Sequence, residues 1–186
     1  MVLELAKRLG SAERLVFDAE MARMMHTSID DVERLADDLQ ELSRLERGKV
    51  VLGNGPCNLA SAVESARESI APHVELVTNV PEPVEGPWDQ RHLARAISEF
   101  ALTTNRAGDG SGRVALTCEP GDRDVALAFV SGAATGRPAS TAPDAGFSFY
   151  RSRQFVVAMG GAVDYSRGDH SATIRVVLPR RREYAL

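Results

Sequence analysis

Apolar positions in the first quarter of the chain recur along one helical seam. The seam consists of Leu15, Ala22, Met25, Ile29, Val32, Ala36 and Leu39, with one interruption at Asp18. Steps of three and four residues are the a/d pattern of a coiled coil or helical bundle. A rival interpretation breaks the helix at Thr27-Ser28, because Ser28 with Asp31 resembles a capping box. We favour one long helix, from Ser11 to Arg47, because the seam continues without a phase shift.

The pattern changes at the end of this helix. Leucines at helical spacing run up to Leu45, and Gly48 then predicts the stop. The apolar run Val50–Leu52 that follows is typical of a strand. A further short amphipathic helix is expected at Val2–Leu9, before the long one. Because a lone amphipathic helix cannot bury its apolar seam, we expect a homodimer through the Ser11–Arg47 helix.

The remainder of the chain alternates between strand and helix patterns. Helices are expected at Leu59–Ile70, from Gln90 to about Thr104, and at Phe147–Met159. Strands are expected at Val74–Val80, Val114–Cys118, Val125–Val130, Ala162–Ser166 and Ala172–Leu178, with a loose small-residue segment at Ser131–Ala145. This order predicts an α+β fold, with helices on one face of a mixed sheet. The domains are then a helical arm (1–48), an α/β sandwich (49–179) and a basic tail (180–186).

Composition narrows the functional classes. A net charge of −4 over 186 residues leaves no basic footprint for nucleic acid. Cys57 and Cys118 are isolated thiols without a CxxC motif, which favours a reduced, cytoplasmic protein without structural zinc. The sequence also lacks an apolar run of about eighteen residues, so no membrane span is expected.

Two stretches carry a resemblance to a known family. Residues 37–52 read DDLQELSRLERGKVVL, and residues 156–163 read VVAMGGAV before the closing IRVVLP. The first resembles the end of the second dimerisation helix of sensor histidine kinases, and the second their IVExHGGxI ending. The resemblance covers roughly residues 30–179. It implies a dimerisation helix joined to an ATP-binding domain of the HATPase (GHKL) type.

The nucleotide-binding motifs of that family are altered in this chain. The stretch from Asp89 to Ala101 follows the family's DxxRLxQALLNLLxNA motif, which places the Mg²⁺-binding asparagine at Thr103. A Thr hydroxyl is a poor replacement, because Mg²⁺ requires firmly placed oxygen ligands in an octahedron. Asn105 would replace it only if the register slipped by two residues. Glu99 keeps a carboxylate that acts as a base in ATPase relatives, although it also fits an ordinary helix position.

The glycine-rich motifs are altered too. The DxGxG motif, whose Asp reads the adenine amino group, begins here with Ser131, and Gly146 is the glycine that survives from GxGLGL. The resemblance therefore implies a degenerate ATP site at Glu99, Thr103, Ser131 and Gly146. We expect no bound metal and no useful binding of ATP.

Kinase chemistry in this family needs a phosphoacceptor histidine, followed by an acidic residue, on the first dimerisation helix. His26 is the one histidine on the predicted arm, and the residue after it is Thr27 rather than an acidic residue. We retain His26 as a candidate phosphoacceptor beside its interpretation as a plain dimer-helix residue. His73, His92 and His170 are expected at the surface.

The sequence thus predicts a histidine-kinase-like protein of two-component signalling, similar to degenerate kinase-like phosphotransferases. It would act as an adaptor or histidine phosphotransferase for a response-regulator receiver domain or a kinase, without autokinase activity. The alternative is a divergent active histidine kinase or ATPase that binds Mg-ATP. A sequestering protein in the manner of anti-sigma factors ranks below both.

Overall fold

The computed structural model describes residues 19–53, 55–81, 83–132 and 146–181. The chain divides into two compact units, residues 1–40 and residues 41–186. The expected helix Val2–Leu9, the start of the arm helix at Ser11 and most of the small-residue segment lie outside the described residues. Among the described residues, no helix has both the length and the apolarity needed to cross a bilayer.

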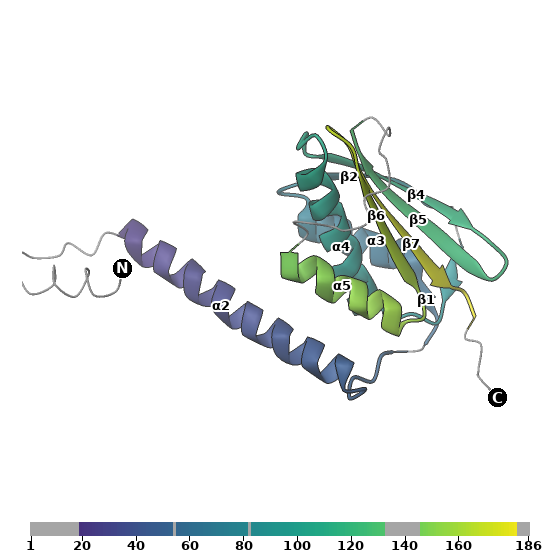
Figure 1. Cartoon of the computed structure of the whole chain (residues 1–186), viewed down its shortest axis with the longest axis horizontal. Helices are drawn as coiled ribbons and strands as arrows, with labels where there is room; N and C mark the ends of the chain where they lie inside the picture. Colours follow the sequence, from purple (N-terminus) through teal and green to yellow (C-terminus); the bar gives the residue numbers. More distant parts are fainter. Residues whose placement is uncertain (1–18, 54, 82, 133–145, 182–186) are drawn as a thin grey trace, which may run out of the picture. The chain divides into compact units, whose positions relative to one another are not determined.

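The arm helix, α2, runs without interruption from Ala19 to Glu46 (Figure 1). The hydroxyls of Thr27 and Ser28 donate to backbone carbonyls one turn earlier, at 3.0 Å and 2.9 Å. A hydroxyl that donates to the carbonyl four residues earlier fits a helix interior, whereas a capping hydroxyl would accept a backbone N–H. The prediction of one long helix is confirmed over this range, and the alternative break at Thr27-Ser28 is wrong.

Gly48 ends α2 in the way its position predicts. Its φ of 66° is in the left-handed region. Its N–H donates to the carbonyl of Leu45 at 2.9 Å, and the Lys49 N–H donates to the carbonyl of Arg44 at 2.8 Å. These two bonds form a Schellman motif, in which glycine satisfies the last helix carbonyls without a Cβ penalty.

The expected strand at Val50–Leu52 is wrong. This run pairs with no neighbour, and the side chain of Val51 is 95% exposed. The first strand is instead β1 (Cys57–Asn58), which pairs antiparallel with β3 (Glu85–Gly86). An apolar run becomes a strand only where a second backbone is available for hydrogen bonds. Val50–Leu52 therefore serves as a linker, with Leu52 packed against the core.

The unit of residues 41–186, called here the body, contains a five-stranded mixed sheet of order β2-β4-β5-β7-β6. Its strands are β2 (Glu75–Asn79), β4 (Arg113–Pro120), β5 (Asp124–Ser131), β6 (Ala162–Arg167) and β7 (Ala172–Pro179). β2 pairs parallel with β4, and the other neighbours are antiparallel.

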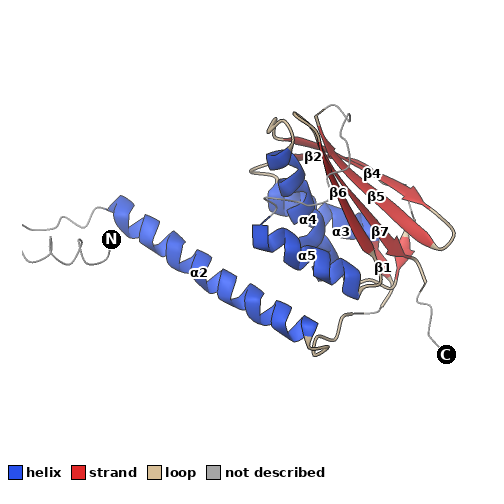
Figure 2. Cartoon of the chain, viewed as in Figure 1, coloured by secondary structure: helices blue, strands red, loops and turns tan. Residues whose placement is uncertain are grey.

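Three helices cover one face of this sheet (Figure 2). They are α3 (Leu59–Ile70), α4 (Gln90–Ala107) and α5 (Gly146–Ala158). Alternate strand residues point toward them and are fully buried, among them Leu116, Leu127 and Ile174. The predicted α+β architecture, with helices on one face of a mixed sheet, is confirmed.

Candidate functional site

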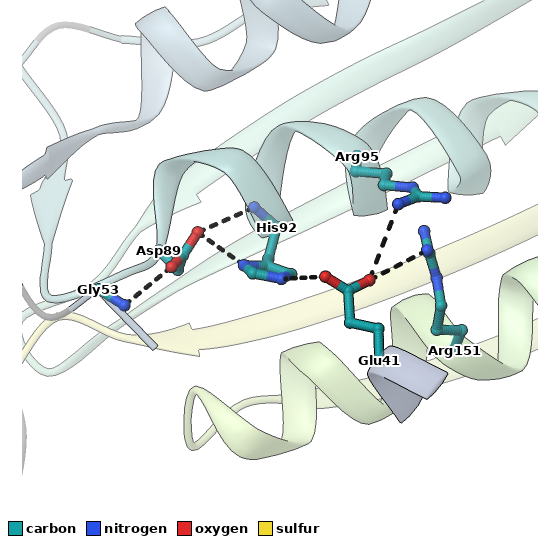
Figure 3. Close-up of polar contacts among 6 residues, drawn as sticks. All are labelled: Glu41, Gly53, Asp89, His92, Arg95 and Arg151. Atoms are coloured by element: carbon teal, nitrogen blue, oxygen red, sulfur yellow. Dashed lines mark hydrogen bonds and ion pairs between the residues drawn. The ribbon is translucent and has the colours of Figure 1, made fainter. Parts of the chain in front are cut away.

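The candidate site is built on α4, whose start is fixed by Asp89. One carboxylate oxygen of Asp89 accepts the backbone N–H of His92 at 3.0 Å, which caps the helix. The other oxygen accepts the N–H of Gly53 at 2.8 Å and ties the linker to the helix start (Figure 3). Burial by itself would raise the pKa of Asp89, but these bonds, together with His92, hold it below its usual value.

Two faces of α4 have opposite character. Leu93, Ile97 and Phe100 are buried against the sheet and the neighbouring helices. The polar side chains His92, Arg95, Glu99, Thr103 and Arg106 follow one another at steps of three and four residues along the helix. Because such steps keep residues on one side of a helix, they form one polar stripe, called here the α4 stripe.

Within the α4 stripe, Glu99 and Thr103 lie together with Arg106. The guanidinium of Arg106 donates to the Glu99 carboxylate at 3.0 Å and to the Thr103 hydroxyl at 3.2 Å. The Thr103 hydroxyl in turn donates to the same Glu99 oxygen at 3.4 Å. The side chain of Thr103 is buried. These three side chains, called here the Glu99 triad, are therefore joined by three mutual hydrogen bonds.

The protonation of Glu99 is set by its surroundings. Burial raises the pKa of Glu99 above its ordinary value, and this effect outweighs the lowering by Arg106, Thr103 and Arg151. A carboxyl group in a dehydrated environment disfavours its charged form. Arg106 restores part of that loss through a charge-assisted hydrogen bond.

Ser131 lies in a separate cluster, at the end of β5. Its hydroxyl donates to a carboxylate oxygen of Asp109 at 2.8 Å, and that oxygen also accepts the Ser111 N–H at 3.1 Å. The bond from Ser111 is the main reason that the pKa of Asp109 is below its usual value. Asp109 belongs to the turn between α4 and β4. A carboxylate from that turn therefore contacts the Ser131 side chain at the end of β5.

The other two sequence candidates are Gly146 and His26. Gly146 is exposed and is the first residue of α5, with a φ of 72°. His26 is exposed on α2, within the unit formed by residues 1–40. The roles suggested for both residues stay predictions. Among the described residues, no group of three or more His, Cys, Asp and Glu side chains is arranged to hold a metal ion.

The expectation that His92 is a surface residue is wrong. Its side chain is only 12% exposed, and its ring stacks on Phe155 with centroids 4.1 Å apart. Its Nδ1 atom lies 2.8 Å from Asp89, and its Nε2 atom lies 3.2 Å from a carboxylate oxygen of Glu41 (Figure 3). His73 and His170 are exposed, as predicted.

The structure adds residues that the sequence analysis did not single out. They are Glu41 near the end of α2, Arg106 on α4, Asp109 after α4, and Arg151 on α5. One signal was available, because Arg106 continues the helical spacing of Glu99 and Thr103. Arg151 is one of the buried residues of α5, which only the structure shows. Glu41 gives no local signal, because its partners come from distant segments, and the bond of Asp109 to Ser131 likewise spans 22 residues.

Comparisons with known proteins place the fold. No protein-family model matches the chain, and no curated protein matches it. The histidine kinase AdeS of Acinetobacter baumannii superposes with a TM-score of 0.75 at 15% identity, over 95% of this chain and 91% of that one. The catalytic domain of histidine kinase ThkA gives 0.55 at 14% identity, over 69% of this chain and 98% of that one.

A third solved structure is that of full-length ShkA in complex with AMPPNP. It gives a TM-score of 0.68 at 18% identity, covering 100% of this chain and 44% of ShkA. This chain therefore spans less than half the length of ShkA. At such identities the likeness concerns the fold, and the body has the fold of the histidine-kinase ATP-binding domain. The resemblance stated from sequence is confirmed at that level.

Proposed function

We propose that this protein is a signalling protein of the two-component type whose ATP site does not bind Mg-ATP productively. It acts as an adaptor or histidine phosphotransferase through its helical arm. The Glu99 triad is the observation that carries this proposal. At the position that the resemblance assigns to a Mg²⁺ ligand, the Thr103 hydroxyl accepts a hydrogen bond from the Arg106 guanidinium at 3.2 Å.

A magnesium ion does not fit this arrangement. Mg²⁺ binds carboxylate and other hard oxygen ligands at about 2.0–2.1 Å in near-ideal octahedral geometry. The one carboxylate of the triad, Glu99, is already paired with Arg106 at 3.0 Å. A dication here would meet a guanidinium cation and would have to displace it. The triad therefore supports a site without metal.

The purine side of the site is also changed. A carboxylate accepts the amino group of adenine, whereas Ser131 offers a hydroxyl that is 2% exposed and already donates to Asp109. A purine that bonded to the Ser131 hydroxyl would have to break that hydrogen bond, which costs free energy. Both changes weaken nucleotide binding, and they do so through different groups.

The arm supplies the interaction surface in this proposal. Six large apolar side chains on α2 are 46–66% exposed: Met24, Met25, Ile29, Val32, Leu35 and Leu39. Burying an apolar side chain of this size stabilises by about 1.5–3 kcal/mol. A second copy of the same helix would cover this row in a homodimer, and the polar surface between Asp30 and Arg47 would remain for a receiver domain or a kinase.

A titration with Mg-ATP tests the loss of nucleotide binding. Isothermal calorimetry of the full chain should give no binding in the micromolar range, with or without Mg²⁺. The double variant Thr103→Asn/Arg106→Ala, which opens the Glu99 triad, measures how much of the loss is due to that triad. Micromolar affinity of the wild-type chain for Mg-ATP would overturn the proposal.

Phosphotransfer is tested separately. The full chain is mixed with a phosphorylated receiver domain, and labelled phosphate on the chain is followed with time. Label on wild type that is lost in His26→Ala, and kept in the matched variant His170→Ala, would assign the transfer to His26. Label that persists in His26→Ala would exclude His26. Stable binding of the receiver without label would identify an adaptor.

A second candidate function is the active alternative, a divergent ATPase or kinase. One observation favours it: the Asp109 carboxylate lies 2.8 Å from the Ser131 hydroxyl and thus returns a carboxylate to the vicinity of the lost Asp. In that case Asp109→Asn should abolish nucleotide binding, whereas the exposed Asp122→Asn in the β4–β5 turn should leave it unchanged. Absence of nucleotide binding in the wild-type chain removes this candidate.

A further inference from the structure

A carboxylate near the end of α2 lies close to a histidine and two arginines of two other helices (Figure 3). One oxygen of Glu41 lies 3.2 Å from Nε2 of His92, and the other lies 3.3 Å from Nη1 of Arg151. Arg95 approaches the second oxygen at 3.8 Å. Glu41, α4 and α5 all belong to the compact unit formed by residues 41–186.

His92 and Arg151 each have contacts other than those with Glu41 that limit their position. His92 is stacked on Phe155 and lies against Asp89, as described above. The Arg151 side chain is 3% exposed, so its rotamer is limited by the packing of α4 and α5. Burying a guanidinium is costly unless it is paired with an anion, and the Glu41 carboxylate is one such partner of Arg151.

The chemistry of that partner follows from the donors. A guanidinium offers its N–H groups in a planar fork that matches carboxylate and phosphate oxygens, and an imidazole adds a donor from another direction. Glu41 is 25% exposed and Arg95 is 37% exposed, so the same place is reachable from solvent. Glu99, whose burial-raised pKa is partly lowered by the charge of Arg151, is paired with Arg106 at 3.0 Å.

We propose that His92, Arg95 and Arg151 form an oxyanion-binding site that Glu41 fills as a ligand from within the chain. An external phosphate or carboxylate group would compete with Glu41 for the same donors. A tethered group competes at an effective concentration on the order of millimolar. In wild type, therefore, external oxyanions bind weakly, and a partner that withdraws Glu41 opens the site. This site is independent of the proposed loss of nucleotide binding.

The test removes the internal ligand. Full-length Glu41→Ala is titrated with inorganic phosphate and, in parallel, with acetate, at constant ionic strength set with chloride. We expect it to bind at least one of the two roughly tenfold or more tightly than wild type, because the competing carboxylate is gone. The comparison of phosphate with acetate identifies which oxyanion the site prefers. Glu46→Ala, an exposed glutamate of the same helix, is the matched control and should behave as wild type.

A second variant places the effect at the proposed donors. Glu41→Ala/Arg151→Met should lose the gained binding, whereas Glu41→Ala with Arg153→Met, at an exposed arginine of α5, should keep it. Binding that survives removal of Arg151, or no gain of binding in folded Glu41→Ala, overturns the proposal. If Glu41→Ala unfolds, phosphate or acetate must restore its far-UV circular dichroism where chloride does not, because a ligand of the folded form stabilises it. Failure of that rescue, in Glu41→Ala and in Glu41→Gln, equally overturns it.

Discussion

The carboxylate of Glu99 on α4 is largely shielded from water. It accepts hydrogen bonds from the Arg106 guanidinium and the Thr103 hydroxyl, which offset part of the cost of burying its charge. Such a group titrates differently in the folded and unfolded chain. Burial raises the pKa of folded Glu99 above the ordinary value of 4.5, so the folded protein holds the proton more tightly than the unfolded one. The free energy of unfolding then decreases as the pH rises through the window above 4.5.

The variant Glu99→Gln isolates this effect. Its side chain has no proton to lose, so the stability of wild type relative to Glu99→Gln should be highest near pH 4 and should fall as the pH rises to about 7. Urea unfolding at several pH values measures the difference. Glu64→Gln, at an exposed glutamate of α3, is the control and should show no such trend. A difference that grows with pH would contradict the described environment of Glu99.

The two cysteines show a residue property that the sequence analysis describes only in part. Their isolation excludes a CxxC site, but their burial is a property of the fold. Burial raises the pKa of Cys57 to about 11, with a smaller contribution from Asp89, and it also raises the pKa of Cys118. Because only the thiolate reacts, iodoacetamide at pH 8 should modify neither thiol in the native protein and both in urea. Mass spectrometry counts the adducts, and rapid native modification would contradict burial.

Among the helices and strands, local pattern determined most boundaries. The helix Leu59–Ile70 is predicted to the residue, since its apolar residues sit on one face between a capping Asn58 and a turn. The β4–β5 and β6–β7 hairpins are also found, because alternation and glycine turns are local signals. The strand predicted at Val50–Leu52 is wrong, because an apolar run does not indicate whether a partner strand lies beside it. The two-residue pair β1–β3 is too short for any periodic signal.

The candidate site was predictable to a smaller extent. The resemblance suggested Glu99, Thr103, Ser131 and Gly146 as site positions, which stays a prediction, and it could not reveal what their side chains contact. Arg106 could be found from helical spacing, whereas Glu41 meets its partners, and Asp109 meets Ser131, only through the tertiary fold. The prediction that His92 is exposed was wrong for the same reason, because its neighbours Phe155 and Glu41 come from other segments of the chain.

The start of α4 carries an element-scale prediction. Asp89 caps the helix and also holds the linker through Gly53, so Asp89→Ala should destabilise the protein by about 1–2 kcal/mol for the cap alone. Its hydrogen bonds hold the pKa of folded Asp89 below 3.8, so this stabilisation is present above pH 3.8. It is lost as the pH falls through the pKa of the folded protein.

Urea unfolding of Asp89→Ala at neutral and at acid pH measures both parts of that prediction. The exposed Asp122→Ala, in the β4–β5 turn, is the control and should cost little at either pH. A penalty for Asp89→Ala that is as large at pH 2 as at pH 7 would mean that the charge of Asp89 contributes nothing to the cap.

At the scale of the whole molecule, the two units differ in how their apolar surface is covered. The unit of residues 41–186 buries its core between three helices and a sheet. The described part of the other unit is a helix whose large apolar side chains are exposed, including Ile29 at 53% and Val32 at 66%. Isolated helices are marginally stable in water, so we expect the arm, unlike the unit of residues 41–186, to gain stability from a partner.

This difference predicts two responses to protein concentration. Amide hydrogen exchange in residues 23–40 should slow as the concentration rises, because a second copy covers the exposed row and stabilises the helix. Exchange in β5 and β7, at the centre of the sheet, should stay the same. In Ile29→Glu/Val32→Glu the arm should exchange fast at every concentration, and sedimentation should report a monomer, because carboxylates cannot be buried in an apolar seam without partners. The substitution Glu33→Gln, on the same helix, should leave the dimer intact. An arm whose exchange is independent of concentration, in a chain that sediments as a monomer, would show that α2 is not the dimer helix.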